Sequence, residues 1–305
     1  QDIEAAFAQI AQRVGLARGH GVAGAGLNIL PPAVVRATKA HDVFAPCVVA
    51  GQAHGLHDGL GARHVKGHFV QPGNGLQPLY HLGHARVVAA QHHTHISGYK
   101  IAITTPVMRE FVGFDDAISG CVLADRVFQN GHRIQAHERQ HLIIEFELAL
   151  QFAHDLPSTT TAWTADSILE CIACAYPCLE IADDRYAVYA DLKKHFVSLV
   201  ADHAGTHGVV LGDRIDKSQF DLLWQTTGTA YVNGQSIGHG HSRDVMGHPL
   251  QAMAWVANHM ASRGHAFKAG QWVTTGSWLA SYFPEAGQAL CFELFDGARV
   301  CVHID

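Results

Sequence analysis

The pattern of hydrophobic and polar positions divides the chain into an irregular part and a well-patterned part. Residues 3–14 carry apolar side chains at helical spacing, which predicts a short amphipathic helix. Residues 15–97 then offer no helix or strand face over most of their length. From Gly98 onward, alternating and helical patterns follow one another regularly, so we place an organisational boundary near residue 97.

The clearest predicted element is a strand over residues 143–152, where side chains alternate between two faces. One face is wholly apolar, with Ile144, Phe146, Leu148, Leu150 and Phe152. The opposite face carries Ile143, Glu145, Glu147, Ala149 and Gln151. The strand therefore presents two carboxylates on one side and a continuous core face on the other.

Shorter patterns predict the other elements of the second part. In chain order they are a helix over 164–175 with Ser167 and Glu170 spaced as a capping box, a strand over 178–182, a hairpin over 231–236 turning at Asn233-Gly234, a helix over 250–262 closed by Gly264, a strand over 272–275, and a hairpin over 292–302 turning at Asp296-Gly297. Strands outnumber helices without alternating with them. This predicts an α+β fold with a mixed, β-rich core and flanking helices rather than a doubly wound sheet.

Composition deepens the contrast at residue 97. Residues 15–97 hold 11 His and 13 Gly, and their only acids are Asp42 and Asp58. Three interpretations of segment 1–97 remain open: a metal-binding His-rich segment, a loosely packed accessory domain, and a gene-model artefact such as a shifted reading frame. Scattered His without ligand spacing is weak evidence for metal, so we favour the last two and expect this segment to be poorly ordered. Residues 98–305 are the expected catalytic domain.

The whole-chain composition excludes several classes of function. Of 305 residues, 48% are hydrophobic and 16% charged, and the formal net charge is −6. A nucleic acid or an anionic membrane needs a concentrated basic footprint, so neither is an expected partner. The sequence contains no run of about 20 apolar residues, so it predicts no membrane span. Seven Cys and no evident export signal predict reduced thiols in a cytoplasmic protein.

Three carboxylates form the main candidate site. Glu145 and Glu147 are two residues apart on one strand, so they project about 7 Å apart from the same face and repel unless a cation lies between them. Glu180 lies among apolar residues of a second predicted strand, where a carboxylate needs a partner. Hard oxygen ligands of this kind suit Mg²⁺, Mn²⁺ or Ca²⁺. The alternative is a solvated polar face of an amphipathic strand, which spacing alone favours.

Other reactive residues have simpler explanations. Cys171, Cys174 and Cys178 lack a second pair at zinc spacing, and the first two fall on the predicted helix, so we interpret them as buried thiols. His248 precedes a helix and suits a capping or packing role, with catalysis as the alternative. His239 and His241 lie in a Gly-rich stretch that we expect to be a solvated loop, with a catalytic base as the alternative.

A series of motifs carries a family resemblance over residues 98–305. In order, the segments are Gly98-Tyr99-Lys100-Ile101-Ala102-Ile103-Thr104-Thr105, Ile144-Glu145-Phe146-Glu147-Leu148-Ala149, Asp155-Leu156-Pro157, Pro177-Cys178-Leu179-Glu180-Ile181, Leu199-Val200-Ala201-Asp202 with Gly208-Val209-Val210-Leu211-Gly212, Gly247-His248-Pro249-Leu250 with Trp255, and Thr275-Gly276-Ser277. Together they resemble the 2-keto-4-pentenoate hydratase / 4-oxalocrotonate decarboxylase family of the fumarylacetoacetate hydrolase superfamily.

The resemblance implies a fold, a cofactor and roles. It implies the mixed β-rich core of the fumarylacetoacetate hydrolase C-terminal type and a homo-oligomer. It makes Glu145, Glu147 and Glu180 ligands of Mg²⁺ or Mn²⁺, and Lys100 the catalytic residue beside the substrate. Thr275, Gly276 and Ser277 would bind substrate oxygens. The expected partner is a small 2-oxo or 2-hydroxy-dienoic acid, whose two neighbouring oxygens can bind a hard cation that stabilises an enolate.

Two departures from the family pattern leave the reaction open. Ile118 stands where the hydratases carry an Asp, and the family's Asp-Asn-Ala-Ser reads Asp202-His203-Ala204-Gly205. We predict a lyase of aromatic meta-cleavage catabolism, a hydratase first, with a 2-oxo acid decarboxylase and then an acylpyruvate-type hydrolase as alternatives. A catalytically weak metal-binding partner subunit is the alternative of another class.

Overall fold

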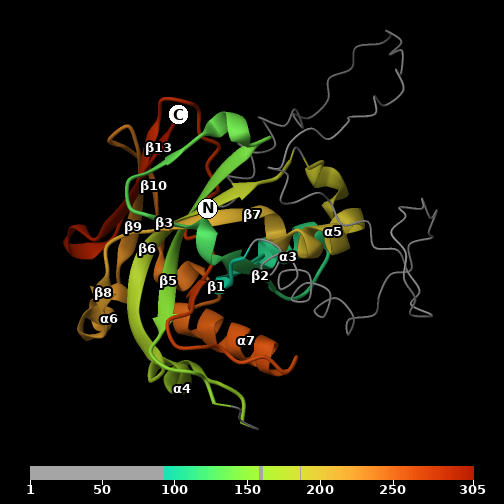
Figure 1. The fold of residues 1–305 in the computed structure, drawn as a ribbon, viewed down its shortest axis with the longest axis vertical. Coiled ribbons are helices and arrows are strands. Elements are labelled where there is room, and N and C mark those ends of the chain that lie inside the picture. Colours follow the sequence, from blue (N-terminus) through green and yellow to red (C-terminus); the bar gives the residue numbers. More distant parts are fainter. Residues whose placement is uncertain (1–92, 158–160, 186) are drawn as a thin grey trace. The chain divides into compact units, whose positions relative to one another are not determined.

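The structure is a computed structural model that describes residues 93–157, 161–185 and 187–305 (Figure 1). The helix predicted over residues 3–14 lies outside the described residues, and so does all but the end of the His/Gly-rich segment. The first described strand, β1, spans Ile96–Ala102 and carries Lys100. Among the described residues, the longest helix has 13 residues, and none has the length and apolarity of a membrane span.

Short helices and longer strands make up this part of the chain. The helices are α3 (Pro106–Val112), α4 (Ala165–Leu169), α5 (Phe196–Ala201), α6 (Phe220–Leu223) and α7 (Pro249–Ala261). The strands after β1 are β2 (Ile118–Leu123), β3 (Val127–Gln129), β4 (His132–Ile134), β5 (Leu142–Phe152), β6 (Ile172–Asp183), β7 (Thr206–Leu211), β8 (Ile215–Asp216), β9 (Thr227–Val232), β10 (Gln235–His241), β11 (Trp272–Thr274), β12 (Ala289–Glu293) and β13 (Arg299–Ile304).

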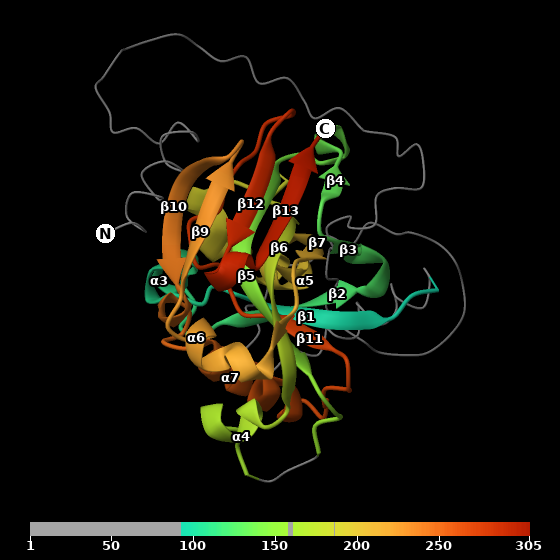
Figure 2. The same cartoon turned by 90° about the vertical axis from the view of Figure 1, so that its left-hand side faces the viewer.

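The strands form two mixed sheets. The larger sheet has the order β2-β1-β11-β5-β6-β7-β3, with β8 also paired to β6. The smaller sheet has the order β10-β9-β12-β13-β4 and faces the viewer in Figure 2. Parallel pairs occur at β1–β11, β3–β7 and β13–β4, and the other pairs are antiparallel. The predicted α+β class with a mixed β-rich core is confirmed.

The main core lies between the two sheets and uses the apolar face of β5. Phe146 and Leu148 on β5 share one buried cluster with Leu290, Phe292 and other residues of the smaller sheet. The rings of Phe146 and Phe292 lie 5.8 Å apart. Packing of one β5 face against the smaller sheet leaves the other face, with its two glutamates, for the candidate site.

Both predicted hairpins and the long helix form where expected. Asn233 and Gly234 both have left-handed backbones, with φ of 49° and 77°, which is the geometry that a two-residue hairpin between β9 and β10 requires. Helix α7 begins one residue before the predicted start, and Gly264 follows it with φ of 73°. These local signals were sufficient because turn geometry depends on few residues.

The helix predicted over 164–175 is mostly wrong. Only Ala165–Leu169 is helical, and Thr164 rather than Ser167 caps it, with the Ser167 side chain completing the capping box. Strand β6 starts at Ile172 and runs through Pro177, so this proline breaks no helix. The Pro177 carbonyl accepts a hydrogen bond from the Gly212 N–H on the side of β6 that faces β7 and β8, and the Pro177 nitrogen faces the same side. A residue without an N–H is tolerated there because β8 pairs with β6 only as far as Ala175 and β7 pairs with β6 only from Cys178 onward.

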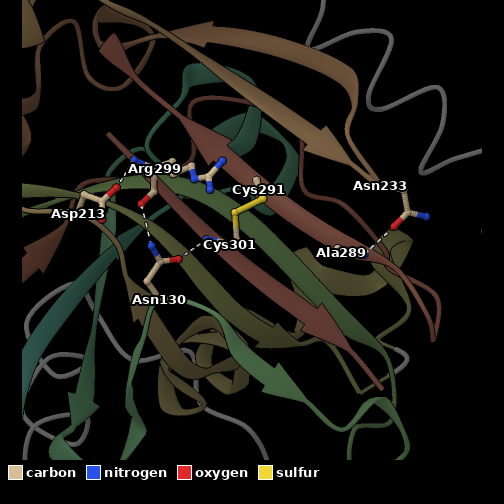
Figure 3. Close-up of a disulfide and its surroundings, with 7 residues drawn as sticks. All are labelled: Asn130, Asp213, Asn233, Ala289, Cys291, Arg299 and Cys301. Carbon is tan, nitrogen blue, oxygen red and sulfur yellow. Dashed lines mark hydrogen bonds between the residues drawn. A yellow bond between two sulfur atoms is a disulfide. The ribbon is translucent and has the colours of Figure 1, made fainter. Parts of the chain in front are cut away.

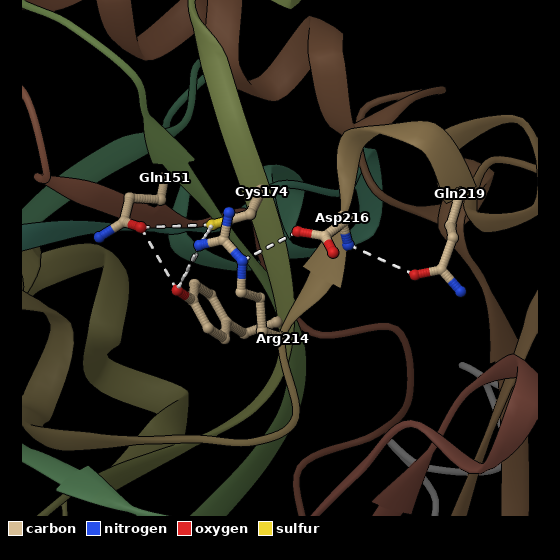
Figure 4. Close-up of polar contacts among 6 residues, drawn as sticks. Gln151, Cys174, Arg214, Asp216 and Gln219 are labelled. Carbon is tan, nitrogen blue, oxygen red and sulfur yellow. Dashed lines mark hydrogen bonds and ion pairs between the residues drawn. The ribbon is translucent and has the colours of Figure 1, made fainter.

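The three clustered cysteines are buried thiols, as predicted, although Cys171 lies in a turn and Cys174 on β6 rather than on a helix. Figure 4 shows Cys174 within a polar group that includes Gln151 and Arg214. The Cys174 thiol donates to Gln151 Oε1 at 3.2 Å, and Arg214 Nη1 lies 2.9 Å from Cys174 Sγ. These contacts are structural links between β6, β5 and the segment before β8.

The expectation that all cysteines are reduced is wrong, because Cys291 and Cys301 form a disulfide (Figure 3). The two residues are directly opposite each other on β12 and β13. Asn130 braces the same hairpin, since its side chain accepts a hydrogen bond from the Cys301 N–H at 2.7 Å. Covalent and polar links therefore converge on the outer face of the smaller sheet.

We predict that breaking this disulfide lowers the stability of the protein. A cross-link of this sequence separation removes denatured-state entropy worth about 2–3 kcal/mol. The double variant Cys291→Ser/Cys301→Ser should lose about that much free energy of unfolding, measured with urea. The wild-type protein in reductant should match it. An unfolding curve of the wild type that reductant does not shift would contradict the disulfide.

A second prediction concerns His259 on α7. Its ring stacks on Trp255 with centroids 4.6 Å apart, and burial together with the nearby Arg263 lowers the pKa of His259 to about 4. On acidification, His259 becomes protonated near pH 6.5 in the unfolded chain but only near pH 4 in the folded protein. The free energy of unfolding should therefore decrease as the pH falls from about 6.5 to about 4, by up to about 1 kcal/mol per pH unit. His259→Gln should flatten this dependence in urea unfolding measured from pH 7.5 to 4.5, and equal slopes for both proteins would contradict it.

Candidate metal centre

The candidate site is built on the pairing of β5 with β6. Glu145 on β5 is directly opposite Glu180 on β6, and Glu147 is opposite Cys178. Residues that are paired across strands project from the same face of the sheet, so the three carboxylates converge. One ligand oxygen from each lies within 4.8 Å of the others. The structure thus brings together all three glutamates that the sequence singled out.

Burial decides between the two interpretations of the alternating strand. Glu147 and Glu180 are both 0% exposed, and Glu145 is half-buried. The predicted alternative of a solvated polar face is therefore wrong. Spacing could not show this, because the cover comes from segments distant in sequence.

A hydroxyl or a backbone N–H donates a hydrogen bond to each carboxylate. The Ser281 hydroxyl donates to Glu145 Oε1 at 2.6 Å, and the Gly276 N–H donates to Glu147 Oε2 at 2.9 Å. The Thr206 hydroxyl at the start of β7 donates to Glu180 Oε1. Two buried oxygens, Glu147 Oε1 and Glu180 Oε2, have no hydrogen-bond partner among the residues that the structure describes. Sequence reasoning missed Thr206 and Ser281, because neither lies in a recognisable ligand spacing.

Lys100 reaches the carboxylates from β1. Its side chain is 2% exposed, and its ammonium nitrogen lies 2.7 Å from Glu180 Oε1. Gly120 is opposite it on β2, and a Cβ at that position would lie 2.9 Å from Lys100 Cγ. Glycine therefore leaves the space through which the lysine stem passes.

The charges in this group do not balance. Burial lowers the pKa of Lys100, but the carboxylates of Glu180, Glu145 and Glu147 outweigh it and raise the pKa overall, so the lysine is an ammonium. Burial, with the like charges of Glu180 and Glu145, raises the pKa of Glu147 well above its usual range. Burial also raises the pKa of Glu180 against the opposing effect of Lys100. If all three carboxylates were ionised, as ligands of a metal are, the single ammonium would leave two negative charges uncompensated.

This arrangement fits a divalent cation. Two uncompensated charges match one divalent ion, and oxygen donors suit hard cations such as Mg²⁺, Mn²⁺ or Ca²⁺. The two buried carboxylate oxygens without partners are the atoms that such an ion would satisfy. Glu145, Glu147 and Glu180 are the residues that would hold it.

The predicted substrate-binding residues lie on the segment that follows β11. The Thr275 N–H and hydroxyl both donate to the Leu148 carbonyl, at 3.0 and 3.1 Å. Gly276 has φ of 110°, and a Cβ there would lie 2.7 Å from Thr104 Cγ2, so this position requires glycine. The Ser277 hydroxyl accepts from the Phe146 N–H at 3.1 Å. Of the three, Gly276 contacts a candidate metal ligand directly.

The histidines that the sequence singled out take no part in the hydrogen bonds to the three glutamates described above. His248 caps α7 by accepting from the Leu250 N–H, as predicted. His239 and His241 lie on strand β10 rather than in the expected loop, although His239 is solvent-exposed as expected. His203, which sequence reasoning had not assigned a role, is 3% exposed, and its Nδ1 accepts the Cys121 N–H at 2.9 Å. This bond ties the turn before β7 to the strand that carries Gly120.

Comparisons with known proteins find relatives of the kind that the sequence motifs resemble. No protein-family model matches the chain. The chain is 28% identical to the 2-keto-4-pentenoate hydratase of Burkholderia vietnamiensis over 60% of its own length and 68% of the relative's. It is 28% identical to the 2-hydroxyhexa-2,4-dienoate hydratase of Comamonas testosteroni over 68% and 76% of the two lengths.

A solved structure shares the fold. The 4-oxalocrotonate decarboxylase of Pseudomonas putida G7, complexed with magnesium and adipate, matches with a TM-score of 0.66 and 22% identity. The match covers 73% of this chain and 83% of that protein. The fold expected from the motifs of residues 98–305 is confirmed.

We predict that divalent cations stabilise this protein through the three glutamates. A ligand that binds only the folded state at 100 times its dissociation constant adds about 2.7 kcal/mol to the free energy of unfolding. Mn²⁺ or Mg²⁺ should therefore shift the urea midpoint of the wild type upward. Glu147→Gln should abolish the shift and leave a metal-free protein at least as stable as the wild type, because it removes a buried like charge. A variant that keeps the full shift would exclude Glu147 as a ligand.

Proposed function

We propose that this relative of the 2-keto-4-pentenoate hydratases and 4-oxalocrotonate decarboxylases, a branch of the fumarylacetoacetate hydrolase superfamily, adds water to a small 2-hydroxy-dienoic or 2-oxo-enoic acid with the help of Mg²⁺ or Mn²⁺. Its similarity to two hydratases supports a hydro-lyase, and we propose a role in aromatic catabolism. The observation that carries the proposal is the buried group of Glu145, Glu147, Glu180 and Lys100, whose charge and unpartnered oxygens call for a cation.

The chemistry of such a substrate suits this site. A 2-oxo acid offers a carboxylate oxygen and a C2 oxygen side by side, and a divalent cation stabilises negative charge that develops on them. Lys100 is the nearby ammonium, and it is positioned to donate a proton or a hydrogen bond to a substrate oxygen. Thr206, Ser281 and the Gly276 N–H hold the carboxylates in place. In the proposal, Thr275, Gly276 and Ser277 border the substrate.

Decarboxylation of a 2-oxo acid is the second candidate. It also proceeds through an enolate, but it does not require a second group to deliver water. Ile118 favours it, since no acid stands where the hydratases carry one. The hydrolase and the weak partner subunit remain outcomes that a panel of substrates would reveal.

The cellular setting is part of the proposal. We expect a homo-oligomer in the cytoplasm, as the family resemblance and the sequence suggest. The Cys291–Cys301 disulfide bears on this, because such bonds are uncommon in reducing compartments. The oxidation state of this pair in cells, measured by thiol labelling, tests the proposed location.

The activity test compares single variants on a panel of 2-oxo and 2-hydroxy-dienoic acids with Mg²⁺ or Mn²⁺. Glu145→Ala, Glu147→Gln, Glu180→Gln and Lys100→Met should each lower kcat/KM at least about 100-fold, since charge stabilisation by a metal is worth several kcal/mol. Glu293→Gln, which alters a half-buried glutamate of β12 in the other sheet, is the matched control and should retain activity.

The products identify the reaction. A hydroxylated product without loss of carbon supports hydration, and release of carbon dioxide supports decarboxylation. Unchanged turnover in both Glu145→Ala and Glu147→Gln would refute the site. Tight metal and oxalate binding by a wild type that turns over no member of the panel would favour the partner subunit.

A further inference from the structure

We propose that Thr274 is a substrate-binding residue whose hydroxyl hydrogen-bonds an oxygen at the carboxylate end of a small 2-oxo acid. This inference rests on the proposed function, and it adds a residue that the motif Thr275-Gly276-Ser277 does not include. The feature behind it is a buried hydroxyl without a partner on the face that carries the metal-binding carboxylates.

Sheet register places Thr274 on that face. On β11, Thr274 is directly opposite Lys100 of β1 on one side and Ala149 of β5 on the other. Directly opposite residues project to the same face of a sheet, and Glu147 lies two residues from Ala149 on that face. Thr274 therefore stands in the row between the lysine strand and the carboxylate strand.

The Thr274 hydroxyl has no partner in the described part of the chain. Thr274 is 0% exposed, and its Oγ1 makes no hydrogen bond to any described residue. A buried hydroxyl left unpaired is costly and calls for an explanation by a ligand or water. Two other buried oxygens without partners, Glu147 Oε1 and Glu180 Oε2, belong to the same face and are accounted for by a cation. The cation does not account for the Thr274 hydroxyl, which is therefore available to a ligand that binds together with the cation.

Neighbouring Thr275 has the opposite situation. Its hydroxyl is bonded to the Leu148 carbonyl, so it is engaged in holding the segment after β11 against β5. Alternation along an extended chain turns the two threonines to opposite faces. The hydroxyl that remains available beside Lys100 is thus that of Thr274.

The chemistry of the site selects the ligand. Beside the Lys100 ammonium and the cation, a neutral hydroxyl donor suits an anionic oxygen better than an apolar group. A hydrogen bond from a hydroxyl to a charged oxygen changes affinity by roughly 10-fold or more. We therefore expect Thr274 to favour acids with a carboxylate next to a C2 oxygen.

The experiment measures binding of oxalate and pyruvate, with Mn²⁺ present, by titration calorimetry. Thr274→Val, which removes the hydroxyl with little change of shape, should weaken both acids about 10-fold. Thr274→Ser should bind within about 2-fold of the wild type. Mn²⁺ binding without acid should be equal in all three proteins. Thr229→Val on β9 in the other sheet is the matched control and should bind like the wild type.

Stability separates a binding role from a structural one. Because the hydroxyl is unpaired in the ligand-free protein, Thr274→Val should unfold at a urea concentration equal to or above that of the wild type. A marked loss of stability would show a structural role and overturn the proposal.

Three other outcomes would also overturn the proposal. The first is that Thr274→Val binds the acids as tightly as the wild type, and the second is that Thr275→Val weakens acid binding while Thr274→Val does not. The third is that Thr274→Ser, which keeps a hydroxyl, binds the acids as weakly as Thr274→Val. A wild type that binds Mn²⁺ but neither acid would reject the proposed function itself.

Discussion

The structure depends on one electrostatic constraint, the burial of three carboxylates beside a single ammonium. Like charges directly opposite each other on neighbouring strands are destabilising, and Glu145 faces Glu180 in that way. Burial in a sheet interior makes the repulsion stronger, because the effective dielectric constant is low. Lys100 compensates one charge, and the raised pKa of Glu147 is the response of the metal-free protein to the rest. The strands that meet here must then be held by packing elsewhere.

That packing comes from the two-sided construction of β5. Its even-numbered residues join the core shared with the smaller sheet, so the strand is anchored by apolar contacts. Its odd-numbered glutamates on the opposite face are thereby fixed in position without help from their own side. The segment after β11 runs along the same strand, since Trp278 donates to the Phe146 carbonyl and Tyr282 pairs with Ile144. This course brings the Gly276 N–H and Ser281 to the carboxylates they orient.

Sequence predicts those features that depend on local pattern. The alternation of residues 143–152 gave β5, and the isolated acid among apolar residues pointed to Glu180. Strand β6 was mistaken in part for a helix because its small residues and Pro177 have no strand signature, and only the gap between β7 and β8 explains the proline. Cys291 and Cys301 are equidistant from Asp296, so the predicted hairpin did contain a signal for their pairing. The groups that contact the carboxylates, by contrast, come from other segments of the chain, and Gly276 and Ser281 lie more than a hundred residues from the glutamates they contact. No local pattern reveals these contacts.

The glutamates and Lys100 at the centre of the site match the family motifs, whereas Ile118 and His203 at its edge depart from them. This contrast bears on the reaction. In the proposed function, a cation held by the carboxylates would act with Lys100 to stabilise an enolate, a step common to hydration and decarboxylation. The fate of that enolate depends on groups that deliver protons, and these are where the chain departs from the hydratases. Ile118 lies in an apolar cluster with Ile103 and Val112, so its position supplies no acid. His203 takes the Asn position of the family motif, and because its Nδ1 accepts the Cys121 N–H, a neutral ring carries its proton on Nε2. Within the proposed function, the choice between hydration and decarboxylation therefore rests with the turn before β7 and with β2, while the carboxylates on β5 and β6 are common to both reactions.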